Sequence, residues 1–195
     1  MTTPTIFVTL ILLTTLNVDI IIASKHGNDY VRDACSVTKY PTVCIRSLSS
    51  FSCKAKRSSH RWARAAVSFT LGEAKSVRRY LGSLRSGGEM RGREGMALLD
   101  CIECFGDTVH QLRSSLFELR RLNGKTFERQ MGNVETWVSA ALSYEDSCSE
   151  GLKGRRGKEV RFLRGKVVNV TQFTSNALSL VNKLASDGGA GFDGP

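Results

Sequence analysis

The sequence predicts an all-α protein, an up-down-up-down four-helix bundle preceded by an N-terminal α-hairpin and cross-linked by disulfides. The chain has three prolines, and none lies between residues 42 and 194. That long stretch therefore carries no proline to break a helix. Its apolar residues recur at spacings of three and four, and no useful run alternates with the period of a strand. Six cysteines, an even number, complete the pattern.

The first two helices show the clearest stripes of apolar residues. The first is expected to begin at Ser58, whose hydroxyl can cap a helix, and its apolar positions continue to Leu84. The second runs through Leu98–Leu119 with spacings that alternate between four and three, as in bundles and coiled coils. A glycine-rich connection over residues 87–95 is expected to join them.

The third helix is expected from about Thr126 to Ser149, and the fourth carries apolar residues from Val167 to Leu184. In the third, the residues expected to face the core are Trp137, Ala141, Tyr144 and Cys148. A basic turn over residues 151–157 separates the two helices. Short connections make sequential helices antiparallel, which gives the up-down-up-down order. Residues 187–195 are glycine-rich and are expected to form a disordered tail.

Residues 1–24 are expected to be a secretory signal peptide, which leaves residues 25–186 as the folded domain. The apolar run Thr5–Leu16 is shorter than the roughly 20 residues that span a membrane. Ala23 and Ser24 are small enough for a cleavage site, although no Lys or Arg precedes the apolar run. An uncleaved anchor is the alternative. No later segment is expected to span a membrane.

Within residues 25–53, Pro41 disfavours helix at Tyr40, which predicts a turn between two short helices. Cys35 and Cys44 flank this turn and could link the two helices. In a secreted chain an even number of cysteines indicates disulfides, but six cysteines allow fifteen pairings. The six are Cys35, Cys44, Cys53, Cys101, Cys104 and Cys148.

The formal net charge is +10. Residues 1–24 contain Asp19 and no Lys or Arg, so their removal would change +10 to +11. Such a protein is attracted to polyanions, either anionic polysaccharides or anionic membranes. Nucleic acid is a poor partner for a secreted protein. A solvated basic surface without any partner is the simpler alternative.

The sequence offers no catalytic or metal-binding constellation. It contains no Gly-x-Ser-x-Gly, no phosphate-binding loop and no metal-ligand spacing. Cys101 and Cys104 have the spacing of a redox pair but lie inside a heptad helix, whereas such pairs open a helix after a strand. His110 lies roughly 240° around the helix from Cys104. We therefore expect no enzyme, no cofactor and no metal.

Four stretches resemble the plant invertase and pectin methylesterase inhibitor family. They are Cys35-Ser-Val-Thr-Lys-Tyr-Pro-Thr-Val-Cys44, Ala97-Leu-Leu-Asp-Cys101, Trp137-Val-Ser-Ala-Ala-Leu142 continued to Cys148, and Thr174-Ser-Asn-Ala-Leu178. The resemblance implies a four-helix bundle after a helical hairpin, with disulfides Cys35–Cys44 and Cys101–Cys148. Cys53 and Cys104 fall outside the pattern, so they are either paired or free.

The resemblance also implies a non-catalytic inhibitor that covers the substrate cleft of its target enzyme. Its partner-contact residues would be Glu103, Asp107 and His110, with Ser147 and Glu150 flanking the fourth family cysteine. His110 departs from the pattern, because the pectin-directed relatives carry an acid there.

The invertase-directed relatives use a Pro-Lys-Phe motif that this chain lacks, which favours pectin methylesterase over acid invertase as the partner. Electrostatic retention by pectin is a further expectation. A basic polyanion- or membrane-binding bundle without an enzyme target is the alternative of another class. The expected location is the apoplast and cell wall, and Asn169-Val170-Thr171 is the one N-glycosylation sequon.

Overall fold

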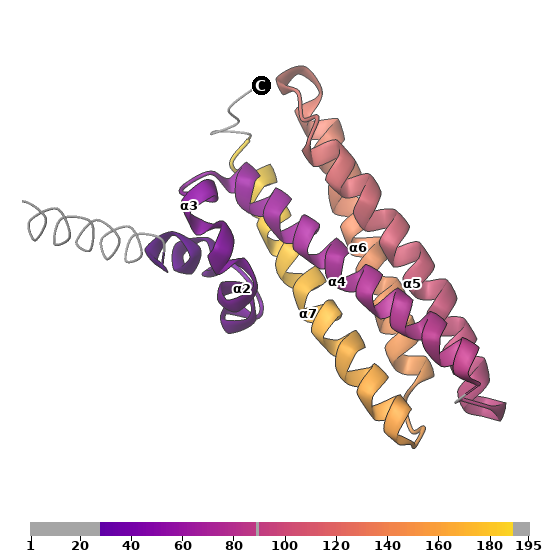
Figure 1. Cartoon of the computed structure of the whole chain (residues 1–195). Helices are drawn as coiled ribbons and strands as arrows, with labels where there is room; N and C mark the ends of the chain where they lie inside the picture. The colour runs from indigo at the N-terminus through magenta and orange to yellow at the C-terminus, as the bar shows by residue number, and fades with distance from the viewer. Residues whose placement is uncertain (1–27, 89, 189–195) are drawn as a thin grey trace, which may run out of the picture.

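The computed structural model describes residues 28–88 and 90–188, and its main body is a bundle of four long antiparallel helices (Figure 1). Each helix packs against two neighbours, so the four form a closed ring around one core. They are α4 (Ser59–Gly87), α5 (Gly92–Leu119), α6 (Phe127–Gly151) and α7 (Lys158–Ser186). The all-α bundle is confirmed. Over the described residues, none of the helices combines the length and apolar character needed to cross a membrane.

Local chemistry sets the ends of α4 and the start of α5. The Ser58 hydroxyl accepts a hydrogen bond from the Arg61 amide, and Gly88 ends α4 in the left-handed region at φ 63°. The predicted glycine-rich connection is too long, because Gly92 and Gly95 already belong to α5. Gly95 allows a close approach there, since a Cβ would lie 3.1 Å from the Met90 carbonyl oxygen.

The N-terminal hairpin consists of helical residues 28–35 followed by α2 (Pro41–Leu48), the 3₁₀ turn η1 (Ser49–Phe51) and α3 (Ser52–Ala55). The Cys35–Cys44 disulfide links its two arms across a Cα–Cα distance of 5.7 Å. On α7, the buried Asn176 side chain accepts from the Tyr40 amide and donates to the Tyr40 carbonyl, both at 2.9 Å. This pair of bonds holds the turn predicted at Pro41 against the bundle.

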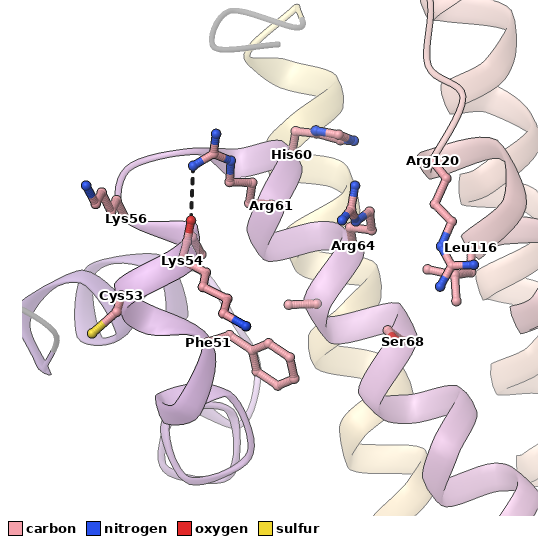
Figure 2. Close-up of a pocket in the computed structure, with 12 residues that line it drawn as sticks. Phe51, Cys53, Lys54, Lys56, His60, Arg61, Arg64, Ser68, Leu116 and Arg120 are labelled. Carbon is pink, nitrogen blue, oxygen red and sulfur yellow. Dashed lines mark hydrogen bonds between the residues drawn. The ribbon is translucent and has the colours of Figure 1, made fainter. Parts of the chain in front are cut away.

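Two more bonds join the hairpin to α4. The indole Nε1 of Trp62 donates to the Lys56 carbonyl at 2.8 Å. Arg61 donates from Nη1 to the Lys54 carbonyl at 3.1 Å (Figure 2). The hairpin therefore sits at a fixed place beside the N-terminal half of α4.

The second disulfide joins α5 to α6, between Cys101 and Cys148, with a Cα–Cα distance of 4.7 Å. Both pairings implied by the family resemblance are confirmed. Cys53 and Cys104, which the sequence left open, are free thiols. The short 3₁₀ turn η2 (Gly124–Thr126) connects α5 to α6.

The apolar stripes predicted for α4, α5 and α7 face the core, but the phase predicted for α6 is partly wrong. Trp137 and Tyr144 are only half-buried, and the core-facing set instead includes Val134, Val138 and Glu145. A pattern of apolar residues assigns the two large aromatic side chains, Trp137 and Tyr144, to the core. The true face of α6 contains a carboxylate, which no hydrophobic pattern can include.

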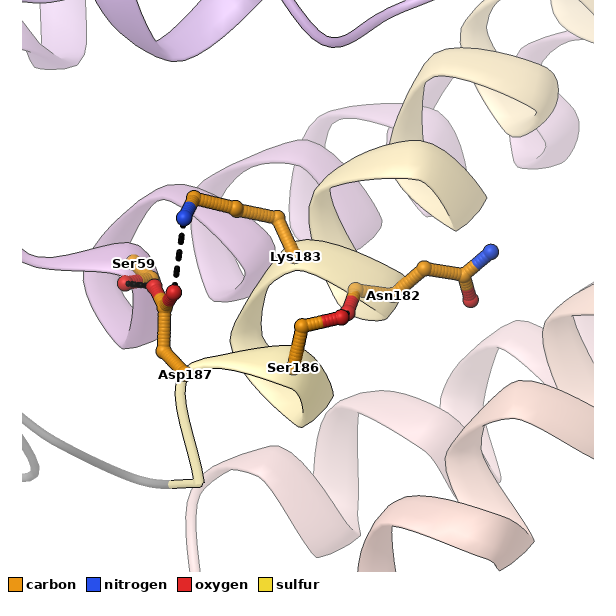
Figure 3. A network of polar contacts seen from close by, with 5 residues as sticks. All are labelled: Ser59, Asn182, Lys183, Ser186 and Asp187. Atoms are coloured by element: carbon orange, nitrogen blue, oxygen red, sulfur yellow. Dashed lines mark hydrogen bonds and ion pairs between the residues drawn. The ribbon is translucent and has the colours of Figure 1, made fainter.

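A polar network joins the C-terminal end of α7 to the first residue of α4 (Figure 3). The Asp187 carboxylate accepts from the Ser59 hydroxyl on α4 and pairs with Lys183 at 2.7 Å. The bond from Lys183, followed by that from Ser59, lowers the pKa of Asp187. The ordered chain thus extends past residue 186 to Gly188. Residues 189–195 of the predicted tail, and the predicted signal peptide, lie outside the described residues.

Glu145 is a fully buried carboxyl that sits in the core between α6 and α7. The Thr174 hydroxyl oxygen lies 2.7 Å from Glu145 Oε1 and 3.0 Å from the Val170 carbonyl oxygen. Burial is the largest influence on this carboxyl and raises the pKa of Glu145 to about 8, although the bond that the Thr174 hydroxyl donates to it acts in the opposite direction.

The raised pKa of Glu145 predicts stability that depends on pH. Between its ordinary pKa of 4.5 and about 8, the folded protein holds a proton that the unfolded chain has lost, so the free energy of unfolding falls as pH rises through this range. We expect Glu145→Gln to match the native protein near pH 4.5 and to be more stable near pH 8, by on the order of 3 kcal/mol. Thermal unfolding followed by circular dichroism across this range is the measurement.

Glu128→Gln is the matched control, because it is the same substitution at an exposed position of the same helix. Its melting profile should follow that of the native protein at every pH. If the melting temperatures of Glu145→Gln and of the native protein changed with pH in the same way, Glu145 would not be protonated in the folded state.

Candidate partner-binding surface

The structure places Glu103, Asp107 and His110 on one exposed stripe of α5. Their spacing of four and then three residues keeps successive side chains within about 60° of one another around the helix. The core residues Cys101, Phe105 and Leu112 occupy the opposite side. The stripe expected from the sequence is therefore a solvent-facing surface.

Two large apolar side chains extend this stripe toward the start of α5. Met96 is 67% exposed and Leu99 is 49% exposed. The spacings from Met96 through Leu99 to Glu103 are three and four, so all share one side of the helix. Neither residue was predicted from the sequence, although each is an apolar residue out of register with the Leu98–Leu119 stripe, and that was the available signal.

On α6, Ser147 and Glu150 are also exposed. The Cys101–Cys148 disulfide sets their level, since Glu103 lies two residues after one cysteine and Ser147 immediately precedes the other. Thr108 adds a second link further along, with its hydroxyl 3.5 Å from the Ala141 carbonyl. We call Met96, Leu99, Glu103, Asp107, His110, Ser147 and Glu150 together the α5–α6 outer face.

The carboxylates of this face are available to a partner to different degrees. Glu150 pairs with Lys153 at 3.2 Å, and both side chains are at least 70% exposed, so water and salt weaken the pair. Within residues 28–88 and 90–188, Glu103 and Asp107 have no salt-bridge partner. Ser147 donates to the Ser143 carbonyl of its own helix at 2.9 Å. Glu103 and Asp107 are thus the carboxylates most ready to accept bonds from another protein.

Cys104 lies beside this face, half-buried between Glu103 and Asp107 in sequence. Burial is the main cause that raises the pKa of its thiol, and the charges of Asp100, Glu103 and Asp107 add to the effect. A reactive cysteine needs the opposite shift. In the part of the chain that the structure describes, no group of three or more His, Cys, Asp or Glu could hold a metal ion.

An α-helical bundle whose outer face is acidic and partly apolar offers the chemistry that suits a surface for binding another protein. The sequence profile described as plant invertase/pectin methylesterase inhibitor matches residues 29–180. The chain belongs to this family.

Pectinesterase inhibitor 6 of Arabidopsis thaliana is 41% identical over 162 residues, which cover 82% of this chain and 77% of that protein. Pectinesterase inhibitor 9 of the same plant is 37% identical, and the match covers 83% of each chain. A crystal structure of a mutant form of a pectin methylesterase inhibitor from Arabidopsis has a TM-score of 0.63 at 20% identity. That match covers 76% of this chain and 92% of the other, and it supports the fold.

These relatives place the chain among pectin methylesterase inhibitor-like members of the family. They are named as inhibitors, which are non-catalytic proteins, so the prediction that the chain is not an enzyme is confirmed. An invertase-directed role is not favoured by these comparisons. The contact residues themselves stay a prediction.

The environments of the two free thiols predict different reactivity. Cys53 is exposed, whereas Cys104 is half-buried and its thiol has a raised pKa. We expect N-ethylmaleimide to modify Cys53 several times faster than Cys104 near pH 7, because the thiolate is the reacting form. The ratio of the two modification rates should become smaller as the pH rises. Peptide mapping by mass spectrometry measures both rates in one sample, and equal rates at neutral pH would contradict the structure around Cys104.

Proposed function

We propose that this protein inhibits a pectin methylesterase by seating the α5–α6 outer face over the substrate cleft of the enzyme. The observation that carries the proposal is the juxtaposition of exposed apolar Met96 and Leu99 with the exposed carboxylates of Glu103 and Asp107. Membership of the family and the names of the relatives support the choice of target.

This combination has the properties of an interface centre. Exposed apolar side chains gain free energy when a partner covers them, and such residues often dominate binding. The neighbouring carboxylates would set orientation by accepting bonds from cationic or hydrogen-bond-donating groups of the enzyme. Gly106 lies between Glu103 and Asp107, and a Cβ added there would meet nothing within 4 Å. The missing side chain lets a partner approach the helix backbone closely.

Inhibition by this route is steric and needs no chemistry from the bundle. A rigid body of four helices, held by the Cys101–Cys148 disulfide, would exclude pectin from the cleft. We further propose that the protein is secreted to the cell wall, which the two disulfides support. Asn169 is exposed on α7, outside the α5–α6 outer face, so a glycan there would leave that face uncovered.

The direct test of the target is a titration of residual enzyme activity. Purified, oxidised protein is added to a plant pectin methylesterase and, in parallel, to an acid invertase. Stoichiometric loss of esterase activity alone is the expected result. Loss of invertase activity alone would overturn the choice of target, and inhibition of neither enzyme would leave a binding bundle without an enzyme partner.

Substitutions on the outer face should weaken inhibition without changing the fold. We expect Asp107→Asn with Glu103→Gln to raise the Kd for the esterase about ten-fold, because two charge-assisted contacts are lost. Leu99→Ala should weaken binding through lost apolar contact. Surface plasmon resonance against the immobilised esterase measures each change. The control Glu128→Gln should bind normally, and unaltered affinity of both outer-face variants, the double variant and Leu99→Ala, would remove α5 from the interface.

A further inference from the structure

A recess of about 770 Å³ lies on the other side of α4 from its packed core, between the hairpin and the C-terminal end of α5. Figure 2 shows Phe51 and Lys54 of the hairpin on one side, Leu116 and Arg120 of α5 on the other, and Arg64 of α4 between them. A recess of this size is in the usual range for a ligand site. It lies outside the α5–α6 outer face.

The charged side chains that line the recess are all positive. Five cations line it, and none of its lining residues is an Asp or Glu. The cations are Lys54, Lys56, Arg61, Arg64 and Arg120. Lys54, Arg64 and Arg120 take part in neither of the salt bridges found in the described part of the chain, Lys153–Glu150 and Lys183–Asp187. Positive charges gathered in a concave site focus the electric field there and attract anions.

Specific bonds hold this recess in shape. Trp62 and Arg61 attach the Lys54–Lys56 segment to α4, as described above. On the opposite side, His60 donates from Nε2 to the Leu119 carbonyl at 2.6 Å, which ties α4 to the end of α5. Both walls are therefore fixed to the same helix, so the backbone around the recess would not have to rearrange on binding.

The backbone of Lys56, at the edge of the recess, has an unusual conformation. Its φ of 48° lies in the left-handed region, where a residue other than glycine is strained. Its carbonyl accepts the Trp62 indole bond, which helps to hold that conformation. The chain thus keeps a strained lysine at a position where glycine would fit the backbone better.

We propose that this recess binds a stretch of a linear acidic polysaccharide, with the uronate carboxylates held by Lys54, Arg64 and Arg120. Arginine guanidinium groups match carboxylates in geometry and can donate two parallel bonds. Phe51, half-buried at one wall, offers an apolar surface to the face of a sugar ring. Net charge alone suggested that an acidic polysaccharide retains the protein, and the recess would be the site at which it does so.

The shape of the recess favours a chain-like ligand over a membrane. A bilayer surface is flat and cannot enter a cavity between two walls, whereas a single saccharide chain can. The disulfides indicate an oxidising compartment, where polyanions are acidic saccharides more often than nucleic acids. Binding in the recess does not depend on which enzyme the protein inhibits.

The test compares two double variants with the same loss of charge. Arg64→Gln with Arg120→Gln removes two cations of the recess, and Arg78→Gln with Arg79→Gln removes two exposed cations elsewhere on α4. Isothermal titration with a de-esterified oligogalacturonate measures affinity for the full oxidised protein. Fully methyl-esterified oligogalacturonate and anionic phospholipid vesicles are the comparison ligands. Lys54→Gln is a third variant, which tests the hairpin wall independently of the arginines.

We expect the recess variant to bind the oligogalacturonate at least ten-fold more weakly, the α4 control to bind it about normally, and affinity to fall with added salt. Loss of binding to the methyl-esterified form would agree. Equal weakening of both double variants would overturn the proposal in favour of net charge alone. Normal binding by Lys54→Gln and the recess variant, or recess-dependent binding of vesicles without binding of the oligosaccharide, would overturn it too.

Discussion

The register between α5 and α6 is the constraint on which the arrangement of the outer face depends, and the Cys101–Cys148 disulfide fixes it. Two stripes with heptad spacing can slide past each other by one helical turn, about 5.4 Å, and still bury apolar residues. A covalent link removes that freedom. It also closes a loop large enough to disfavour the unfolded chain by roughly 3–4 kcal/mol in the chain-entropy model. Glu103 and Ser147 consequently stay near the same level of the bundle.

The core is specified by polar groups as well as by apolar stripes. The Asn176 side chain hydrogen-bonds both the amide and the carbonyl of Tyr40, and Glu145 accepts from Thr174 between α6 and α7. Each of these groups would be costly to bury without its partner, so each rejects alternative packings of the same stripes. Such contacts support one arrangement of the hairpin and of α7 where hydrophobic burial alone would tolerate several.

This division explains which parts of the fold were predictable. The stripes of α4 and α5 are long and regular, and the structure buries them as predicted. The phase of α6 was partly wrong because Glu145 occupies a core position, and its partner Thr174 lies 29 residues away in the sequence. The α5 stripe of Glu103, Asp107 and His110 followed from resemblance and helical spacing. Met96 and Leu99 required measured exposure, since an apolar residue is ordinarily assigned to the core.

Net charge conceals how the charges are distributed. The formal net charge of +10 is a sum over the whole chain and says nothing about where the charges lie. In the structure, the carboxylates of Glu103 and Asp107 lie on one face of α5, whereas Lys54, Arg64 and Arg120 line the recess. No sequence pattern places those three cations together, because the hairpin, α4 and α5 meet only through tertiary packing. An acidic polymer is repelled by the first surface and attracted by the second. The proposed retention on an acidic polysaccharide would therefore orient the bundle and leave the α5–α6 outer face free for the proposed enzyme partner.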